Sequence, residues 1–284
     1  MIDVHLLDIE ELDESIILDI YERADSLRLK QEGSLLAGKT CIIFFPESSI
    51  RTRVTFEKGI QQLGGRTILF PPEALDKPER LRDVMGYLEN WADAAIIRHP
   101  DLDKLRELAA QAHIPVINAM TTYNHPCEIL ADLYALRLQR PDYRGLTYAF
   151  VGPPGNIGRT WMHMAQVMGL TFIHVCRPGQ QMAEEGRHYR FTDSLEEALR
   201  ESDVVLTDPL PTPFREESYY RDYRITPERM ALARPGALLN PCPPFCVEEE
   251  VSGSVIDSPY FVGYGFKRHL LEVQQAALLY GLER

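Results

Sequence analysis

Short, continuous runs of apolar residues recur along the chain and are separated by longer stretches with a different spacing. Continuous runs of this kind are typical of strands buried on both faces of a parallel sheet. Seven runs are predicted to be strands: KTCIIFF (39–45), AAIIR (94–98), PVIN (115–118), LTYAFV (146–151), TFIHVC (171–176), DVVLT (203–207) and GALLN (236–240).

The stretches between these runs carry apolar residues at helical spacing. In VTFEKGIQQLGG, Phe56, Ile60 and Leu63 recur four and three positions apart, and Gly64 and Gly65 follow as a stop signal. Strands that alternate with helices predict an α/β fold in which helices cover both faces of parallel sheets. Ligands of such sheets bind at the carboxyl ends of the strands.

Length and a polar break predict two domains. The chain has 284 residues, more than the roughly 100–200 residues of a typical domain. The best boundary is RLQRPDYRG (137–145), which is polar and separates a predicted helix from a new strand. We expect a first domain over residues 1–138 and a second domain from residue 139.

Composition limits the classes of partner. Hydrophobic residues make up 45% and charged residues 25%, as in ordinary globular proteins. The net charge of −12 argues against a nucleic-acid partner, although a local basic pocket can still bind a small anion. No apolar run approaches the roughly 20 residues of a membrane span, and the acidic N-terminus does not resemble a secretory signal.

The cysteines indicate a reducing compartment. They are odd in number and lack the C-x-x-C spacing of a structural zinc site, so we expect neither a disulfide framework nor a bound metal. The five cysteines stand at positions 41, 127, 176, 242 and 246. The sequence therefore predicts a cytoplasmic protein.

An anion site is predicted directly after the first strand. Ser49, Arg51 and Thr52 stand in a loop that opens into a helix. Helix-start N–H groups, two hydroxyls and a guanidinium together favour phosphate. The alternative is a serine or threonine helix cap beside solvated arginines.

Two further residues follow later strands. Arg98 ends the run AAIIR, and His125 precedes the helix ILADLYALRL. Either residue could be structural when taken alone, and an isolated histidine in such a position is more often structural than catalytic.

Taken together, three segments resemble the aspartate/ornithine carbamoyltransferase family. They are S-x-R-T-R-x-x-F-E from Ser49, D-A-x-I-x-R-H-P from Asp93, and V-I-N-A…H-P-C-x-I-L-A-D-L from Val116, in this order and at these distances. The segment 256–282 is similar to the closing strand and C-terminal helix of that family, so most of the chain is covered.

The resemblance implies an activity and an architecture. Members transfer the carbamoyl group of carbamoyl phosphate to an amine, without a metal or an organic cofactor. Two doubly wound parallel-sheet domains are implied, with the active site between them: a carbamoyl-phosphate domain (1–138) and an acceptor domain (139–262). The last segment, 263–284, would pack back on the first domain, and homotrimers or multiples of trimers are expected.

The resemblance also assigns roles to residues. Ser49, Arg51 and Thr52 would hold the phosphate, and Thr52, Arg98 and His125 would surround the carbamoyl oxygen, where negative charge develops during attack. The leaving phosphate can accept the proton of the amine. Lys77 matches a lysine that aspartate-type members extend into a neighbouring subunit's site, or it is a solvated loop lysine.

Three positions depart from the family pattern. Ile50 replaces a hydroxyl residue in S-T-R-T-R and should at most weaken phosphate binding. Glu128 replaces a glutamine, so it can accept a hydrogen bond from the carbamoyl NH2 but adds a charge that must be paired or protonated. Asn240-Pro241-Cys242-Pro243 stands for H-C-L-P, where Pro241 and Cys242 would offer backbone carbonyls to the carbamoyl NH2.

The glycine-rich turn VGPPGNIGRTW (151–161) superficially suggests a dinucleotide site. It is not G-x-G-x-x-G, and the next strand ends at Arg177 without the acidic residue that NAD requires. A site for NADP, with Arg177 on the 2′-phosphate, remains an alternative and would make the protein a reductase. In the family this turn faces the amine; Asn156 matches ornithine-type members and Arg159 matches aspartate-type members.

A loop after the strand at 203–207 bears on the acceptor. Ornithine-type relatives place an aspartate where Asp208 stands, and Thr212 belongs to the same loop. Asp208 and Asn156 favour a cationic, ornithine-like acceptor, whereas Arg159 would hold a carboxylate. Asp208 could instead cap the loop before a proline.

Two further hypotheses stay open beside the ornithine-type enzyme. One is an aspartate-type carbamoyltransferase. The other is a catalytically inactive paralogue that binds or regulates, as Ile50, Glu128 and Asn240 would allow.

Overall fold

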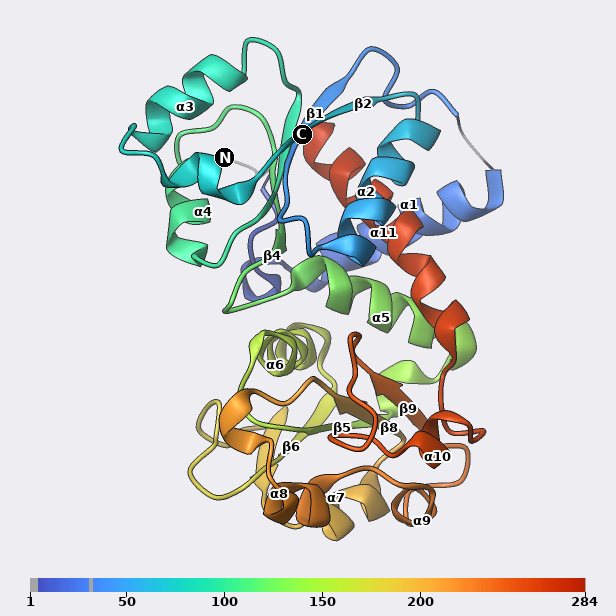
Figure 1. Cartoon of the computed structure of the whole chain (residues 1–284). Coiled ribbons are helices and arrows are strands. Elements are labelled where there is room, and N and C mark those ends of the chain that lie inside the picture. The colour runs from blue at the N-terminus through green and yellow to red at the C-terminus, as the bar shows by residue number, and fades with distance from the viewer. Residues whose placement is uncertain (1–4, 31–32, 284) are drawn as a thin grey trace. The chain divides into compact units, whose positions relative to one another are not determined.

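The chain folds into two compact α/β units. The structure is a computed structural model that describes residues 5–30 and 33–283. Unit 1 contains the chain up to Ala135 and the C-terminal segment from Lys267, and unit 2 spans Leu136–Phe266. Each unit is built on one parallel sheet (Figure 1). The predicted fold class is confirmed.

Unit 1 has the strand order β2-β1-β3-β4 among its described residues. The strands are β1 (Thr40–Phe44), β2 (Arg66–Phe70), β3 (Ala94–Arg98) and β4 (Val116–Met120). The chain runs from β1 outward to β2 on one side, and from β3 outward to β4 on the other. The direction of winding therefore reverses between β1 and β3.

The helices of unit 1 bury their apolar faces against this sheet and each other. They are α1 (Glu14–Lys30), α2 (Ile50–Gln62), α3 (Leu81–Leu88), α4 (Leu102–Ala109), most of α5 (Pro126–Gln139) and α11 (Leu270–Leu282), with the 3₁₀ turns η1 (Ile9–Glu11), η2 (Pro72–Asp76) and η5 (Tyr264–His269) at its edges.

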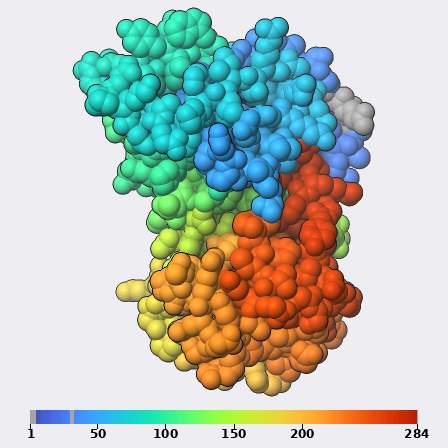
Figure 2. All heavy atoms as spheres, viewed as in Figure 1, coloured from blue at the N-terminus to red at the C-terminus, as the bar shows by residue number. Residues whose placement is uncertain are grey.

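The C-terminal helix α11 belongs to the core of unit 1. It is apolar nearly all round and packs against both α1 and α2, so the red end of the chain lies against blue segments in Figures 1 and 2. Gly59 makes one close crossing possible, because a Cβ there would lie 3.0 Å from Cγ of Gln275. At the same crossing, Gln275 Nε2 donates to the Gly59 carbonyl at 2.8 Å.

Unit 2 has the strand order β7-β6-β5-β8-β9 among its described residues. The strands are β5 (Thr147–Val151), β6 (Thr171–Val175), β7 (Tyr189–Thr192), β8 (Val204–Thr207) and β9 (Leu238–Pro241). The helices are α6 (Asn156–Met168), α7 (Leu195–Glu201), α8 (Glu217–Tyr223), α9 (Pro227–Met230) and α10 (Gly253–Ile256), with η3 (Tyr143–Gly145) and η4 (Thr212–Phe214). Winding reverses here between β5 and β8.

All seven predicted runs are strands in the structure, but β2 and β7 were missed. β2 is an edge strand whose Ile68, Leu69 and Phe70 are exposed, and β7 is short and mixed in polarity. Among the described residues, no helix combines the length and the apolar character needed to cross a bilayer.

Candidate active site

Predicted site residues of unit 1 gather where the winding of its sheet reverses. Ser49 follows β1, and Arg98 is the last residue of β3, the neighbouring strand. Loops diverge at such a reversal and leave a crevice at the carboxyl edge, which is where ligands bind in open α/β sheets.

A hydrogen bond joins the two strand ends across this reversal. Arg98 Nη1 donates to Ser49 Oγ at 2.9 Å. Ser49 is the N-cap residue of α2, but its side chain makes no capping bond. The first-turn N–H groups of a helix lack partners within the helix, so the start of α2 can serve an anion. The alternative interpretation of this segment expected a serine side chain to cap the helix, and Ser49 forms no such bond.

The other residues of the segment differ in exposure. Thr52 is buried, whereas Arg51 and Ile50 are exposed, with 62% of Ile50 accessible. Arg98 is half-buried; burial lowers the pKa of its guanidinium, and the charge of Glu128 opposes that effect. An arginine remains protonated under any such shift, so Arg98 is a permanent donor at this edge.

His125 is held in a buried polar loop between β4 and α5. Asn124 fixes this loop: its Oδ1 accepts from Asn118 Nδ2 at 2.7 Å and from Thr121 Oγ1 at 2.8 Å, and its Nδ2 donates to the Leu7 carbonyl at 3.0 Å. Only 6% of His125 is exposed, and burial lowers its pKa to about 4. The imidazole is therefore neutral near pH 7.

Glu128 lies in the first turn of α5 and is paired. Lys267 Nζ donates to Glu128 Oε1 at 2.7 Å and to the two oxygens of Asp132 at 2.6 and 2.8 Å. Burial acts to raise the pKa of Glu128, but the positive charges of Lys267 and Arg51 hold it below its usual value. The sequence required the carboxyl to be paired or protonated; the structure shows the pair.

The partner in that pair was missed. Lys267 lies 139 positions beyond Glu128, in η5, and local spacing cannot join residues at such separation. The available signal was the buried acid Asp132, which stands four residues after Glu128 on the same helix face and needs a cation.

Lys77 stands apart from this cluster. It is exposed and follows η2, in the loop after β2. The preceding residue, Asp76, is anchored to the strand end: His99 Nε2 lies 3.0 Å from Asp76 Oδ1, and Lys104 also pairs with that oxygen. Because the Asp101 N–H donates to His99 Nδ1 at 3.1 Å, Nε2 carries the proton that bonds Asp76. The loop that bears Lys77 is thus tied to the residue after Arg98.

In unit 2, the predicted residues lie at the ends of β5 and β8, which flank the winding reversal, and of the neighbouring strand β9. Asn156 begins α6 after β5, Asp208 follows β8, and Pro241 ends β9. The Cys242 N–H donates to the Thr207 carbonyl at 2.9 Å, which joins the ends of β8 and β9.

The start of α6 lies close to Asp208. Gly155 is the N-cap of α6 without a side-chain cap, and a Cβ on it would lie 3.5 Å from Asp208 Oδ2. Arg159, half-buried, is on the first turn of α6, and Thr212 is exposed in η4.

The glycine turn of unit 2 has a packing explanation. A Cβ on Gly158 would lie 2.6 Å from Cε1 of the buried Phe150, so glycine lets α6 approach β5. Arg177, which the NADP hypothesis needs, donates to Glu216 at 2.5 Å and Ser218 at 2.8 Å and stacks on Tyr219. These contacts argue against the reductase.

A second cluster, in unit 2, contains side chains of the types that ligate metals. Potential ligand atoms of Cys246, Glu249 and Glu250 lie within 4.8 Å of one another. Burial raises the pKa of the Cys246 thiol and raises that of Glu250 to about 7. Both shifts disfavour the deprotonated forms that would bind a metal cation. Glu250 accepts from the Cys246 N–H at 2.6 Å, and Glu249 pairs with Arg215 at 3.2 Å. The cluster stabilises its own loop.

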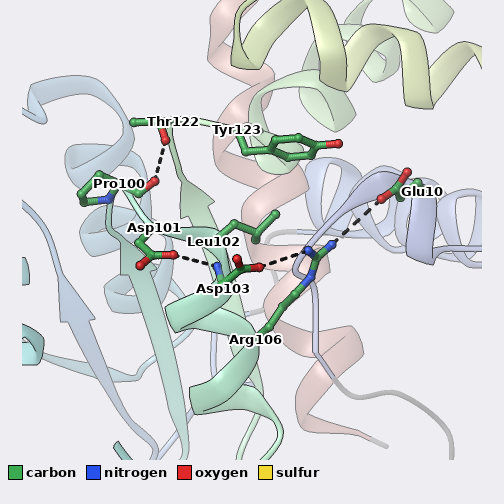
Figure 3. A pocket seen from close by; sticks show the side chains of 8 residues that line it. All are labelled: Glu10, Pro100, Asp101, Leu102, Asp103, Arg106, Thr122 and Tyr123. Carbon is green, nitrogen blue, oxygen red and sulfur yellow. Dashed lines mark hydrogen bonds and ion pairs between the residues drawn. The ribbon is translucent and has the colours of Figure 1, made fainter. Parts of the chain in front are cut away.

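Unit 1 has an open pocket of about 600 Å³, and Figure 3 shows the side chains that line it. Three of its lining side chains are acidic, and Arg106 pairs with Glu10 and Asp103 inside it. The predicted site residues are not among its lining residues, all of which are described: Glu10, Pro100, Asp101, Leu102, Asp103, Arg106, Thr122 and Tyr123. Its acidic lining does not suit phosphate.

Two family models together match nearly the whole chain. The carbamoyl-P binding domain of aspartate/ornithine carbamoyltransferase matches residues 4–138, and the Asp/Orn binding domain of the same family matches residues 144–281.

Individual relatives match over almost their full lengths. The chain is 31% identical to an ornithine carbamoyltransferase of Paracidovorax citrulli (97% of this chain, 95% of the relative) and 32% identical to one of Chromobacterium violaceum (97% and 96%). Two solved structures share the fold. One is ornithine carbamoyltransferase from Burkholderia thailandensis, with 29% identity and a TM-score of 0.87 over 96% of each chain. The other is ornithine carbamoyltransferase from Pyrococcus furiosus, with 26% identity and a TM-score of 0.89 over 96% of this chain and 95% of that chain.

Proposed function

The chain belongs to the aspartate/ornithine carbamoyltransferase family, and from this premise we propose that it transfers the carbamoyl group of carbamoyl phosphate to an amine of ornithine or a close analogue. The observation that carries the proposal is the hydrogen bond from Arg98 to Ser49, at 2.9 Å. It brings a permanent cation to a helix start that its own side chains leave uncapped.

The phosphate end of the donor is proposed to bind at this helix start. Ser49, Arg51 and Thr52 offer hydroxyls, a guanidinium and backbone N–H groups, which together match the oxygens and charge of a phosphate. Ile50 contributes its backbone only, since its exposed side chain carries no donor.

Carbamoyl transfer requires charge stabilisation at the carbamoyl oxygen. The amine attacks the carbonyl carbon, the oxygen gains negative charge, and the bond to the phosphate oxygen then breaks. Arg98, Thr52 and His125 are proposed as donors to that oxygen, each worth roughly 3–4 kcal/mol of barrier in comparable sites. His125 serves as a neutral donor, because burial keeps its pKa at about 4. The departing phosphate accepts the amine proton.

The acceptor is proposed to bind in unit 2. Asp208 supplies a carboxylate beside the start of α6, which suits an ammonium group of a diamino acid. Asn156 and Arg159 lie on the first turn of the same helix, where a guanidinium can hold the α-carboxylate. An aspartate acceptor would place a second carboxylate against Asp208, which is unfavourable.

Assembly and location are proposed on separate grounds. We expect a homotrimer, with Lys77 reaching a neighbouring subunit's site. The exposed apolar side chains of β2 (Ile68, Leu69 and Phe70) support an association surface on unit 1. We place the protein in the cytoplasm because its five cysteines are free thiols.

A panel assay tests the proposal. Purified protein is incubated with carbamoyl phosphate and ornithine, other diamino acids, aspartate or monoamino acids, and both phosphate release and ureido product are measured. Ornithine or a close analogue should react faster than aspartate, and Asp208→Asn should raise KM for that acceptor while barely affecting carbamoyl phosphate. Binding of carbamoyl phosphate without turnover of any amine would instead identify an inactive paralogue.

A further inference from the structure

A negative charge stands inside the proposed anion site. Glu128 is 6% exposed; the charge of Arg51 acts to lower its pKa, and its own charge acts to raise the pKa of Arg98. These are the two guanidiniums proposed to meet the phosphate and the carbamoyl oxygen. A buried carboxylate whose charge acts on both guanidiniums can compete with an anionic substrate, unless another cation holds it.

Lys267 is that cation. Its ammonium bonds Glu128 through Oε1 only, at 2.7 Å, and bonds both oxygens of Asp132 at 2.6 and 2.8 Å. Glu128 and Asp132 are four residues apart on α5, so one ammonium can bridge both side chains on that helix face. The contact to Asp132 anchors the lysine independently of Glu128.

The second oxygen of Glu128 lies near His125. Glu128 Oε2 lies 4.0 Å from Nε2 of His125, beyond hydrogen-bond range. The oxygen is therefore turned toward the residue proposed to meet the carbamoyl oxygen. The NH2 of a carbamoyl group is bonded to the same carbon as that oxygen and needs an acceptor close by.

Building on the proposed function, we infer that Lys267 is a positioning residue that holds the Glu128 carboxylate by Oε1. This contact keeps the carboxylate away from Arg51 and Arg98, so that both stay available to the donor substrate. It also presents Oε2 as the acceptor for the carbamoyl NH2. Lys267 itself does not touch the substrate in this arrangement.

A double-mutant cycle tests this inference by binding. Lys267→Met, Glu128→Gln and the double variant are titrated calorimetrically with inorganic phosphate and with carbamoyl phosphate. Lys267→Met should weaken both by at least about tenfold, because the released carboxylate pairs with the arginines. Glu128→Gln should bind phosphate as well as the wild type or better. The double variant should behave like Glu128→Gln, which is a rescue.

The pH dependence supplies a second readout. In the Lys267→Met variant, the ionised Glu128 carboxylate competes with phosphate for the arginines, and protonation of Glu128 would remove that competitor. Lowering the pH should then protonate Glu128, release the arginines and restore phosphate binding in that variant relative to the wild type. The charged or titratable groups around Glu128 are His125, Arg51, Arg98, Lys267 and Asp132. The Glu128→Gln/Lys267→Met double variant differs from Lys267→Met only at Glu128, so comparing the two isolates the titration of Glu128.

Two controls guard against a purely structural effect. Lys39→Met removes another ion-paired lysine of unit 1, bonded to Asp93 at 2.8 Å at the opposite end of β1, and should leave phosphate binding unchanged. Lys267→Arg keeps a cation at this position and should retain phosphate binding. This variant can still be measured if the methionine variant does not fold.

A double variant that binds phosphate as weakly as Lys267→Met would overturn the inference, because Lys267 would then act on the anion directly or through the fold. Wild-type turnover with ornithine is measured in parallel and reports on the proposed function alone. The phosphate titrations still decide the role of Lys267 if no turnover is found.

Discussion

Arg98 is the residue on which the proposed chemistry depends most. It is half-buried at the end of β3, and its bond to Ser49 links two loops without filling a core position. Its replacement should therefore affect the reaction far more than the fold.

Arg98→Ala should lower kcat for carbamoyl transfer by about 100- to 1,000-fold, the usual effect of removing one oxyanion donor. The control is Arg106→Ala, which removes an arginine paired at the surface of the pocket in Figure 3 and should leave kcat near the wild-type value. Activity of Arg98→Ala within about threefold of wild type would remove Arg98 from this role.

His174 gives a prediction about pH and stability. It is fully buried; its Nε2 donates to the Gly152 carbonyl at 2.8 Å, so its Nδ1 accepts from the Tyr189 hydroxyl at 3.1 Å. Burial lowers its pKa to about 4 from the ordinary 6.5. Below about pH 6.5 this histidine is protonated in the unfolded chain, whereas in the folded chain it is protonated only below about pH 4. The stability that this difference contributes is therefore lost as the pH falls from about 6.5 to 4.

His174→Gln can keep the bond to Gly152 but cannot titrate. Its free energy of unfolding should therefore fall less steeply than the wild type's between about pH 6.5 and 4, by at most about 1.4 kcal/mol per pH unit. The slope of unfolding free energy against pH must be compared between variant and wild type, because other groups also titrate. Glu250, whose pKa is raised to about 7, contributes in the opposite direction and stabilises the fold as the pH falls. The exposed His113→Gln is the control, and equal slopes for His174→Gln and wild type would contradict the assignment.

At the scale of elements, the packing of α6 on β5 explains why a glycine stands at position 158. Gly158 lies on the face of α6 that touches Phe150, and a methyl group there would clash with the ring at 2.6 Å. The same turn resembled a nucleotide motif in the sequence, yet this glycine is explained by helix–strand packing.

Gly158→Ala should destabilise the protein by about 1–3 kcal/mol through overpacking. Gly86→Ala, in α3, is the matched control because a Cβ there meets no atom within 4 Å. The control should stabilise the helix by up to about 1 kcal/mol. Urea unfolding measures both variants; a Gly158→Ala protein as stable as Gly86→Ala would refute the packing argument.

The sequence predicted buried strands better than exposed or short ones, since the edge strands β4 and β9 are mostly buried and were predicted. β1 and β3 are buried on both faces and therefore read as continuous apolar runs, whereas the exposed edge strand β2 and the short strand β7 lack that signal. The placement of Ser49 beside Arg98 followed from strand ends meeting at one sheet edge. Lys267 could not be joined to Glu128 by any local pattern, because a buried ion pair depends on tertiary packing.

At the scale of the whole molecule, the proposal predicts a shared site. Light scattering should report three chain masses, and Lys77→Ala should be inactive or nearly so if Lys77 completes a neighbour's site. Mixing Arg98→Ala and Lys77→Ala chains after mild dissociation should then restore part of the activity, because some sites receive both intact residues. A fully active monomer, or no recovery in mixed assemblies, would contradict sharing.

The central claim is that this chain carbamoylates an ornithine-like amine. The most direct measurement is the initial rate of ureido-product formation from ornithine and from aspartate, each with carbamoyl phosphate, alongside released phosphate and with Arg98→Ala as the blank. We predict one phosphate per ureido product, a faster rate with ornithine, and near-blank rates for Arg98→Ala. Faster carbamoylation of aspartate, or no product from either amine, would contradict the account.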